Sequence, residues 1–406
     1  MRRYNLEKVK RKYLLILLSV ILAISLLIYK SINALDNNLT KKEKIEDFQY
    51  MYDVIKKSYP YLELNKRVNN VDWLENKDIY LEKIKNTKND NEFINELNNI
   101  LGDLNNGHTH LIDNYSLFKL FNNSYGELGW YDFFDEDIVK KRYEGLEEIK
   151  GNNKSFSKED LILKDIVEGE VGYIYLPEMT PRGNSIEEDI DLISKYIKTL
   201  ENHKSIVIDI RGNGGGNDSY WMEVISRIIP KSYNASGYIL FRDSEIINEY
   251  INSRDINVED IQYLPKEIIN NGPNEINSDF KYFVKNNRLI ETMDSINFKG
   301  KIYLLVDRVV YSSAESFSIF CKESGIATVI GETTAGDGGG YDPILFKLKN
   351  SGLIVRMAGD MYLTGSGICN EEFKTIPDYI IDNPIRTKEF SDDNCINKVL
   401  ELNQSN

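Results

Sequence analysis

The longest run of hydrophobic positions lies near the N-terminus, at residues 13–29, and its seventeen residues (YLLILLSVILAISLLIY) include no charge. Folded as a helix, this run spans about 26 Å, close to the thickness of the hydrocarbon core of a bilayer. Residues 1–12 contain six basic residues, whereas only Lys30 follows the run directly. The pattern predicts a single-pass transmembrane helix at the cell membrane, with a cytoplasmic tail at residues 1–12 and an extracellular remainder. A cleaved signal peptide is the alternative, although no clear cleavage site follows the run.

Hydrophobic positions at helical spacing characterise the next part of the chain. After a polar linker at residues 30–45, apolar residues recur every three or four positions through residues 46–111. The pattern is interrupted near Pro60 and Asn69, so we expect a small domain of several helices. Residues 112–165 are aromatic and charged without a clear period, and we treat them as a connecting segment.

Short apolar runs that alternate with helical segments extend over residues 166–385. This alternation predicts an α/β domain whose sheet is covered on both faces. Strands are expected at residues 170–176, 205–210, 301–307, 327–332, 344–349 and 353–359, and helices at residues 186–200, after Asn217 and at residues 313–324. The polar, Asn-rich residues 231–297 are interpreted as an insertion into this domain, and residues 386–406 as a C-terminal tail.

Composition narrows the classes of function. The chain has 50 Lys and Arg against 64 Asp and Glu, a net charge of −14, which argues against a generic nucleic-acid binder because phosphates need a basic surface. The 41% of hydrophobic residues is sufficient for a large core. Three scattered cysteines, Cys321, Cys369 and Cys395, exclude a disulfide scaffold and a four-cysteine zinc site. Whether Cys369 pairs with Cys395 stays open.

A serine lies where an expected strand passes into an expected helix, in the segment LLVDRVVYSSAESF. At such a turn the hydroxyl of Ser312 is exposed beside the free N–H groups of the helix, which suits a nucleophile and an oxyanion site. Ser312 and Glu315 also have the spacing of an ordinary capping box, which is the structural alternative. Ser313, the next residue, is the alternative candidate both for the nucleophile and for the capping residue.

A glycine-rich loop follows the strand that ends at Ile210, in the segment DIRGNGGGND. Gly212, Gly214, Gly215 and Gly216 permit positive φ angles and let a ligand approach bare backbone N–H groups. The loop can therefore be part of an oxyanion hole or an anion cradle, although it matches neither phosphate-binding glycine motif. A tight turn without chemical importance is the other interpretation.

Two of the three histidines, His108 and His110, lie in the segment NNGHTHLID just after an expected helix. An imidazole is the usual base for a serine, and two histidines two positions apart in an extended segment face opposite ways. Only one of them can therefore meet the serine. Near the C-terminus, Glu371 and Glu372 could supply a carboxylate that orients the histidine, or could be solvated surface residues. This residue set indicates neither a metal site nor an organic cofactor.

The order of four motifs resembles the tail-specific, or C-terminal processing, serine peptidase family, which includes the tricorn core protease. These motifs are DIRGNGGG at residues 209–216, SSAE at 312–315, GETTAG at 331–336 and IPD at 376–378. The resemblance covers about residues 45–385. It implies a crotonase-like, ClpP-like core of stacked ββα units.

By this resemblance Ser312 is the nucleophile, and the N–H groups of Ser313 and of a glycine in the loop at residues 212–216 form the oxyanion hole. Bacterial processing peptidases carry a lysine base where this chain has Asp337. The chain is instead similar to the histidine-using, tricorn-like branch, with His108 as base and Glu371 as the carboxylate that orients it.

Two further departures affect how the histidine and the substrate are held. Gly107 precedes His108 where tricorn has a serine, and residues 112–165 lack the pattern of a PDZ module. His110, Glu372 and Asp337 are therefore kept as alternative site residues.

These observations predict a membrane-anchored, extracytoplasmic serine peptidase that acts on peptides or proteins without a cofactor. A catalytically inactive peptide- or ligand-binding protein on the same fold is one alternative. A crotonase-like acyl-thioester hydrolase is another. The oligomeric state is not predicted.

Overall fold

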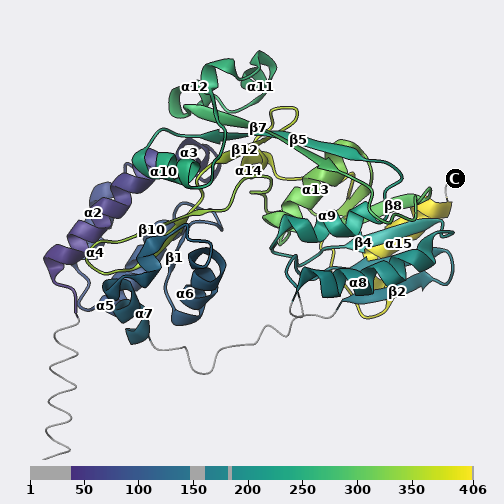
Figure 1. Cartoon of the computed structure of the whole chain (residues 1–406), viewed down its shortest axis with the longest axis horizontal. Helices are drawn as coiled ribbons and strands as arrows, with labels where there is room; N and C mark the ends of the chain where they lie inside the picture. Colours follow the sequence, from purple (N-terminus) through teal and green to yellow (C-terminus); the bar gives the residue numbers. More distant parts are fainter. Residues whose placement is uncertain (1–37, 147–160, 182–184, 405–406) are drawn as a thin grey trace, which may run out of the picture.

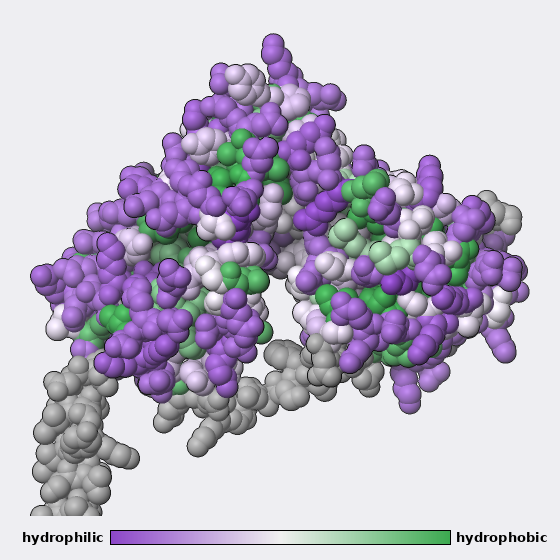
Figure 2. Space-filling view, viewed as in Figure 1, coloured by the Kyte–Doolittle hydropathy of each residue, from purple (hydrophilic) through white to green (hydrophobic). Residues whose placement is uncertain are grey.

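The computed structural model describes residues 38–146, 161–181 and 185–404. In Figure 1 they form two lobes joined across the top by a bridge of long strands, and Figure 2 shows an opening between the lobes. The predicted transmembrane helix at residues 13–29 lies outside the described residues. Within them, no helix combines the length and the apolar character needed to cross a bilayer.

The first lobe begins with four helices, the first of which starts inside the expected linker at residues 30–45: α2 (Lys41–Ser58), α3 (Leu62–Asn69), α4 (Lys77–Lys85) and α5 (Asp90–Gly102). A reciprocal capping box fixes the start of α2: the Thr40 hydroxyl accepts from the N–H of Glu43, and the Glu43 carboxylate accepts from the N–H of Thr40. The same helix buries Phe48, Met51 and Ile55 on one face. The helical spacing in the sequence therefore corresponds to one side of each helix packed into a common core.

A three-stranded antiparallel sheet completes this lobe, with β11 (Ile354–Met357) between β1 (His110–Ile112) and β10 (Ile344–Lys347). The expected strands at residues 344–349 and 353–359 do form, but they join β1 rather than the main sheet. The described part of the connecting segment packs on them as α6 (Tyr115–Phe121), η1 (Asn122–Gly126), η2 (Asp132–Asp135) and α7 (Asp137–Gly145). A hydrophobic run predicts a strand, but it does not predict which strand will pair with it.

The second lobe is built on a six-stranded sheet in the order β13-β9-β8-β4-β3-β2, parallel except for the antiparallel pair β2/β3. Its strands are β2 (Ile162–Val167), β3 (Val171–Tyr175), β4 (Ser205–Asp209), β8 (Lys301–Val306), β9 (Thr328–Gly331) and β13 (Tyr379–Ile380). Helices α8 (Ile186–Ile197), α9 (Asp218–Ser226) and α13 (Ser313–Ser324) contribute to the core on one face, and η3 (Lys198–Leu200) extends α8. The predicted α/β alternation is confirmed here.

The opposite face of this sheet is covered by the C-terminal helix α15 (Asn394–Gln404), which follows η5 (Phe390–Asp392). Ile396 and Val399 of α15 are buried against Val207 of the central strand β4. Of the expected C-terminal tail at residues 386–406, the described part up to residue 404 thus packs on the fold, because a parallel sheet must be covered on both faces. All three cysteines are buried free thiols, so Cys369 and Cys395 do not pair.

Residues 231–297 form most of the bridge between the lobes. Strands β5 (Tyr233–Phe241) and β7 (Tyr282–Ile290) pair over nine residues, with β12 (Met361–Thr364) and β6 (Glu259–Asp260) at the two edges. The remaining elements near this sheet are α10 (Glu245–Ser253), η4 (Ile261–Tyr263), α11 (Lys266–Asn271), α12 (Ile276–Asp279) and α14 (Asn370–Phe373). The insertion is therefore an ordered part of the fold, despite its polar composition.

Candidate active site

Ser312 lies at a sharp turn in front of α13. Its φ of 57° and ψ of −121° are a conformation that L-residues other than glycine rarely adopt. The Ser312 side chain makes no capping hydrogen bond to α13, and Glu315 is fully buried and bonded elsewhere. The capping-box interpretation is therefore wrong. The Ser312 Oγ instead lies 3.0 Å from Nε2 of His108.

His108 reaches Ser312 from the first lobe, on the loop between α5 and β1. Its Nδ1 lies 2.7 Å from Oδ2 of Asp337, and its backbone N–H donates to Oδ1 of Asn106. Its ring packs on that of Tyr311, with 4.7 Å between the centroids. A side chain on Gly107 would start only 3.1 Å from the Tyr311 ring, so the glycine makes room for this packing.

Asp337 is the carboxylate that contacts the histidine. Its Oδ2 also accepts from the Asn106 amide at 2.7 Å and from the Tyr311 hydroxyl at 2.9 Å, and its Oδ1 accepts from the Tyr61 hydroxyl at 2.9 Å. Burial raises the pKa of Asp337, but the positive charge of His108 and the hydrogen bonds from His108, Asn106 and Tyr311 outweigh burial and lower the pKa to about 2. Asp337 is consequently ionised at neutral pH.

Glu371, expected to orient the histidine, does not contact it. Its Oε1 accepts from Asn106 at 3.2 Å, and its Oε2 lies 3.4 Å from Nζ of Lys374. Burial, followed by the negative charge of Asp337, raises the pKa of Glu371 to about 8. Asp337 therefore occupies the position expected for Glu371, because its loop brings a carboxylate directly to Nδ1 of His108. Glu371 contacts Asn106 instead of the histidine.

The other alternative residues lie away from Ser312. The Nδ1 of His110 lies 3.3 Å from the Gly107 carbonyl oxygen, and burial, then the charge of Arg356, lowers the pKa of His110 to about 4. Glu372 forms an ion pair with Arg67 at 2.6 Å. Within the described residues, no group of three or more His, Cys, Asp or Glu side chains is placed to share a metal ion.

The glycine loop presses against Ser312. A Cβ on Gly215 would lie 2.8 Å from the Cβ of Ser312, and Gly215 has a φ of 108°. However, the Gly215 N–H donates to Oδ1 of Asn213, and the Gly212 N–H donates to Asp307. These two N–H groups are therefore already used, which removes them from the expected oxyanion donors. Gly214 does not line the cavity that holds Ser312.

Gly216, the last glycine of the expected donor loop at residues 212–216, is better placed. In its parallel bridge with Met179, the Met179 N–H donates to the Gly215 carbonyl, and the Asn217 N–H donates to the Met179 carbonyl. The N–H of Gly216 takes no part in this bridge. Gly216 and Ser313 line the same cavity as Ser312, so their N–H groups are the candidate oxyanion donors.

A buried ion network fixes the start of the glycine loop. The Arg211 guanidinium contacts Asp209 at 2.6 Å and Asp393 at 2.7 Å, and all three side chains are buried. Asp393 also accepts from the N–H of Cys395 at the start of α15. The C-terminal segment therefore restrains the loop that lies against Ser312.

A second buried network holds the Asp337 loop. Glu315 accepts from Asn370 at 2.6 Å and from Thr375 at 2.7 Å, and Asn370 accepts in turn from the N–H of Gly338. Burial raises the pKa of Glu315. Ser312 directly precedes helix α13, and Glu315, three residues later in the first turn of the helix, anchors the Asp337 loop.

Ser312, His108 and Asp337 line a cavity of about 480 Å³. Its charged lining residues besides the His108 pair are Asp218, Arg288, Asp342, Arg356 and Asp360. Arg288 forms an ion pair with Asp218. Asp360 accepts from the N–H of Tyr341, and burial raises its pKa well above the ordinary value.

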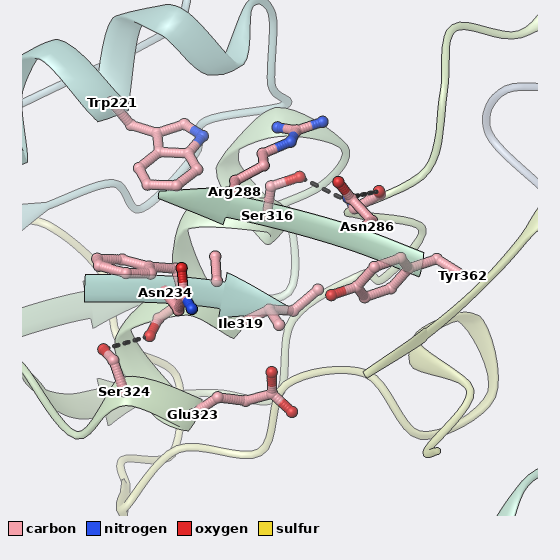
Figure 3. Close-up of a pocket in the computed structure, with 12 residues that line it drawn as sticks. Trp221, Asn234, Asn286, Arg288, Ser316, Ile319, Glu323, Ser324 and Tyr362 are labelled. Atoms are coloured by element: carbon pink, nitrogen blue, oxygen red, sulfur yellow. Dashed lines mark hydrogen bonds between the residues drawn. The ribbon is translucent and has the colours of Figure 1, made fainter. Parts of the chain in front are cut away.

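A smaller recess adjoins this cavity and shares Arg288, Ser316 and Gly339 with it. Figure 3 shows its aromatic walls, with Trp221 and Tyr362 at opposite sides. The recess is small, with a volume of about 30 Å³ in this conformation.

Comparison with known proteins identifies the family of this chain. The sequence model of peptidase family S41 matches residues 170–381, more than half of the chain. The chain belongs to peptidase family S41. The predicted resemblance to the tail-specific serine peptidases is thereby confirmed, and the fold is the mixed α/β fold of S41 peptidases. No curated protein sequence matches this S41 chain.

Two solved structures share the fold of this S41 chain. A predicted peptidase from Parabacteroides merdae has a TM-score of 0.57 at 19% identity, covering 89% of this chain and 96% of its own. Mature CPAF complexed with lactacystin has a TM-score of 0.59 at 12% identity, covering 90% of this chain and 99% of its own. The TM-scores show a common fold, and at identities below 20% the similarity carries no conclusion about function.

Proposed function

We propose that this S41 chain is a serine-type endopeptidase with Ser312 as nucleophile, His108 as base and Asp337 as the carboxylate that orients the base. The observation that carries the proposal is the unbroken contact series from Ser312 to His108 at 3.0 Å and from His108 to Asp337 at 2.7 Å. A serine, an imidazole and an ionised carboxylate in this order are the groups that acyl transfer requires.

In the proposed reaction, Nε2 of His108 takes the hydroxyl proton of Ser312 while Oγ forms a bond to the peptide carbonyl carbon. The carbonyl electron pair moves onto oxygen, where the N–H groups of Gly216 and Ser313 stabilise it. The C–N bond then breaks, and the amine leaves with the proton from His108. Water repeats the sequence on the acyl-enzyme, releasing the acid and restoring Ser312.

Asp337 has two roles in this scheme. It fixes the tautomer of His108 by accepting from Nδ1, and its negative charge stabilises the imidazolium that forms. Donors from Asn106, Tyr311 and Tyr61 keep the carboxylate ionised and fixed in direction. An aspartate here replaces the lysine base of the bacterial relatives, so the histidine performs the proton transfer.

Labelling with a fluorophosphonate tests the proposal, because this probe reacts with activated serines. We expect the full chain to be modified at Ser312, and Ser312→Ala and His108→Ala to be unmodified. Ser124→Ala, which changes another serine of the same cavity, is the matched control and keeps the label. Peptide cleavage should follow the same pattern.

Other outcomes would support the alternative functions. A folded wild-type chain that neither reacts with the probe nor cleaves peptides would favour a non-catalytic binding protein. A chain that reacts with the probe and hydrolyses acyl-thioesters but not peptides would favour a thioester hydrolase on this fold.

We also propose that the peptidase domain is anchored in the cell membrane and faces outward. The support is the uncharged run at residues 13–29 and the six basic residues that precede it. In cells that express the full chain, a C-terminal tag should sediment with membranes and be removed by protease added outside. A tag that stays protected until the cells are lysed would contradict the orientation.

A further inference from the structure

Arg356 is an unpaired cation in the wall of the catalytic cavity. It lies on β11, where it pairs in register with His110 of β1 and Leu345 of β10. Its neighbours on the strand, Val355 and Met357, are buried in the core of the first lobe, whereas Arg356 lines the cavity together with Ser312. A guanidinium therefore faces the same space as the proposed nucleophile.

Nothing in the described chain neutralises this charge by direct contact. The Nε of Arg356 is inaccessible to solvent and has no hydrogen-bond partner, and the side chain makes no ion pair with a described residue. Burial lowers its pKa. The other arginine of the cavity, Arg288, differs because it forms an ion pair with Asp218.

An aromatic ring packs against Arg356, whereas the carboxylates of Asp337 and Asp342 influence its charge without forming an ion pair with it. Its guanidinium carbon lies 5.4 Å from the ring centroid of Phe121, and Tyr125 lines the cavity with it. His110, its cross-strand neighbour, is neutral at physiological pH because its pKa is about 4. Asp342 lines the same cavity but is exposed and forms no ion pair with Arg356 within the described chain.

A partly desolvated cation without a direct ion-pair partner is costly, so its presence favours an anion that arrives with the ligand. We propose that Arg356 binds a carboxylate group of the substrate and thereby selects which peptides reach Ser312. The planar guanidinium offers paired N–H donors in the geometry that a carboxylate accepts, which an ammonium group does not. The carboxylate can come from the C-terminus of the peptide or from an Asp or Glu side chain.

This inference rests on the proposed peptidase function, and three libraries of N-acetylated hexapeptides test it. The first has free C-termini and no acidic residues. The second has amidated C-termini and no acidic residues. The third has amidated C-termini with Asp and Glu allowed at every position, and cleavage is measured by mass spectrometry.

We expect the first or the third library to be cleaved about 10- to 100-fold more efficiently than the second, as for a charge-assisted contact. Preference for the first library identifies the C-terminus as the source of the carboxylate. Preference for the third identifies an acidic side chain. The gain should appear mainly as a lower KM, because the contact positions the substrate rather than the reacting atoms.

Variants of Arg356 separate binding from folding. Arg356→Met keeps the aliphatic stem and should remove the preference while still cleaving the amidated neutral peptides. Arg356→Lys retains the charge without the paired donors and should keep part of the preference. Arg308→Met, which removes an exposed arginine outside the cavity, is the matched control and should behave as wild type.

The outcomes distinguish the two proposals. Cleavage of all three libraries at equal efficiency, or a preference that survives Arg356→Met, overturns the inference about Arg356 alone. A folded wild-type chain that cleaves none of the libraries overturns the peptidase proposal, and the inference with it.

Discussion

The lobe that carries Ser312 and the lobe that carries His108 hold their residues in different ways. Ser312 stands between β8 and α13, and its position is set by the strand-to-helix turn of a parallel sheet. His108 lies on a loop after α5, and its position is set by side chains from distant parts of the chain. The nucleophile is thus fixed by local architecture, whereas the base is fixed by contacts between lobes.

This contrast implies that the two halves of the site fail in different ways. A change in the second lobe should act through the stability of its core and of the glycine loop. A change around His108 should leave the fold intact and misplace the imidazole. The four predictions below test this difference, in order of decreasing effect.

Replacing the carboxylate that joins the lobes should have the largest effect. Asp337→Asn keeps the size of the side chain but removes the charge and offers Nδ1 of His108 an amide. We expect kcat to fall by about 10³- to 10⁴-fold with the melting temperature little changed. Asp342→Asn, an exposed carboxylate of the same cavity, should lose little activity. Equal losses in both variants would show that general cavity charge, not orientation of the histidine, is responsible.

Disrupting the ion network beneath the glycine loop should act on stability first. Asp393→Ala leaves Arg211 buried with one of its two carboxylates and removes the cap at the start of α15. We expect the free energy of unfolding to fall by about 3 kcal/mol in urea titrations. Asp392→Ala, at the exposed neighbouring position, is the control and should change it little. An Asp393→Ala chain of wild-type stability would contradict the assigned role of the network.

The raised pKa of Glu371 should make the stability of the protein depend on pH. Between about 4.5 and 8 the native chain holds a proton on Glu371 that the unfolded chain has released. The native state therefore binds more protons, so this group lowers the free energy of unfolding as pH rises through that window, by on the order of a few kcal/mol. Glu371→Gln should remove this decline, with a small effect on kcat.

The control for this measurement is Glu372→Gln, because Glu372 pairs with Arg67 rather than facing Asp337. Urea titrations at pH 5, 6, 7 and 8 give the comparison. An unchanged slope in Glu371→Gln would mean that another group causes the decline, and a loss of kcat as large as that of Asp337→Asn would return Glu371 to the role of orienting carboxylate.

Filling the space beside the Tyr311 ring should have the smallest effect. Gly107→Ala places a methyl group 3.1 Å from that ring, so the ring and the neighbouring His108 must shift by a few tenths of an ångström. We expect kcat to fall by roughly tenfold or less, since small misplacements of a base are tolerated in part. Gly102→Ala, which meets nothing within 4 Å, is the matched control. Full activity in Gly107→Ala would show that the site absorbs the shift.

The sequence predicted the second lobe more accurately than the first. The strands β3, β4, β8 and β9 and the helix α13 lie where alternating apolar runs placed them, because buried parallel strands are nearly continuous hydrophobic segments. The same reasoning placed β10 and β11 in the wrong sheet. Strand partners depend on which edges meet in three dimensions, and a hydrophobic run does not record that.

The candidate site shows a similar division. Ser312 and His108 could be chosen from residue type and motif, and Asp337 was noticed only because it stands where relatives have a lysine. Gly216 belonged to the glycine loop expected to supply a donor, but the sequence did not distinguish it from the other glycines there. Arg356 and Asn106 carried no sequence signal strong enough to single them out. Asn106, two residues before His108, is recognisable only once its amide is seen to touch both Asp337 and Glu371.

The sequence by itself determined the family, the α/β alternation and the residue types of a serine-based site, because these depend on local pattern and on short motifs. Only the tertiary structure decided which carboxylate faces His108, which N–H groups remain for an oxyanion and which arginine lacks a partner. Asp337 and His108 are 229 positions apart, and Ser312 and His108 are 204 apart. Contacts over such separations arise when the lobes pack together, and no local sequence pattern encodes them.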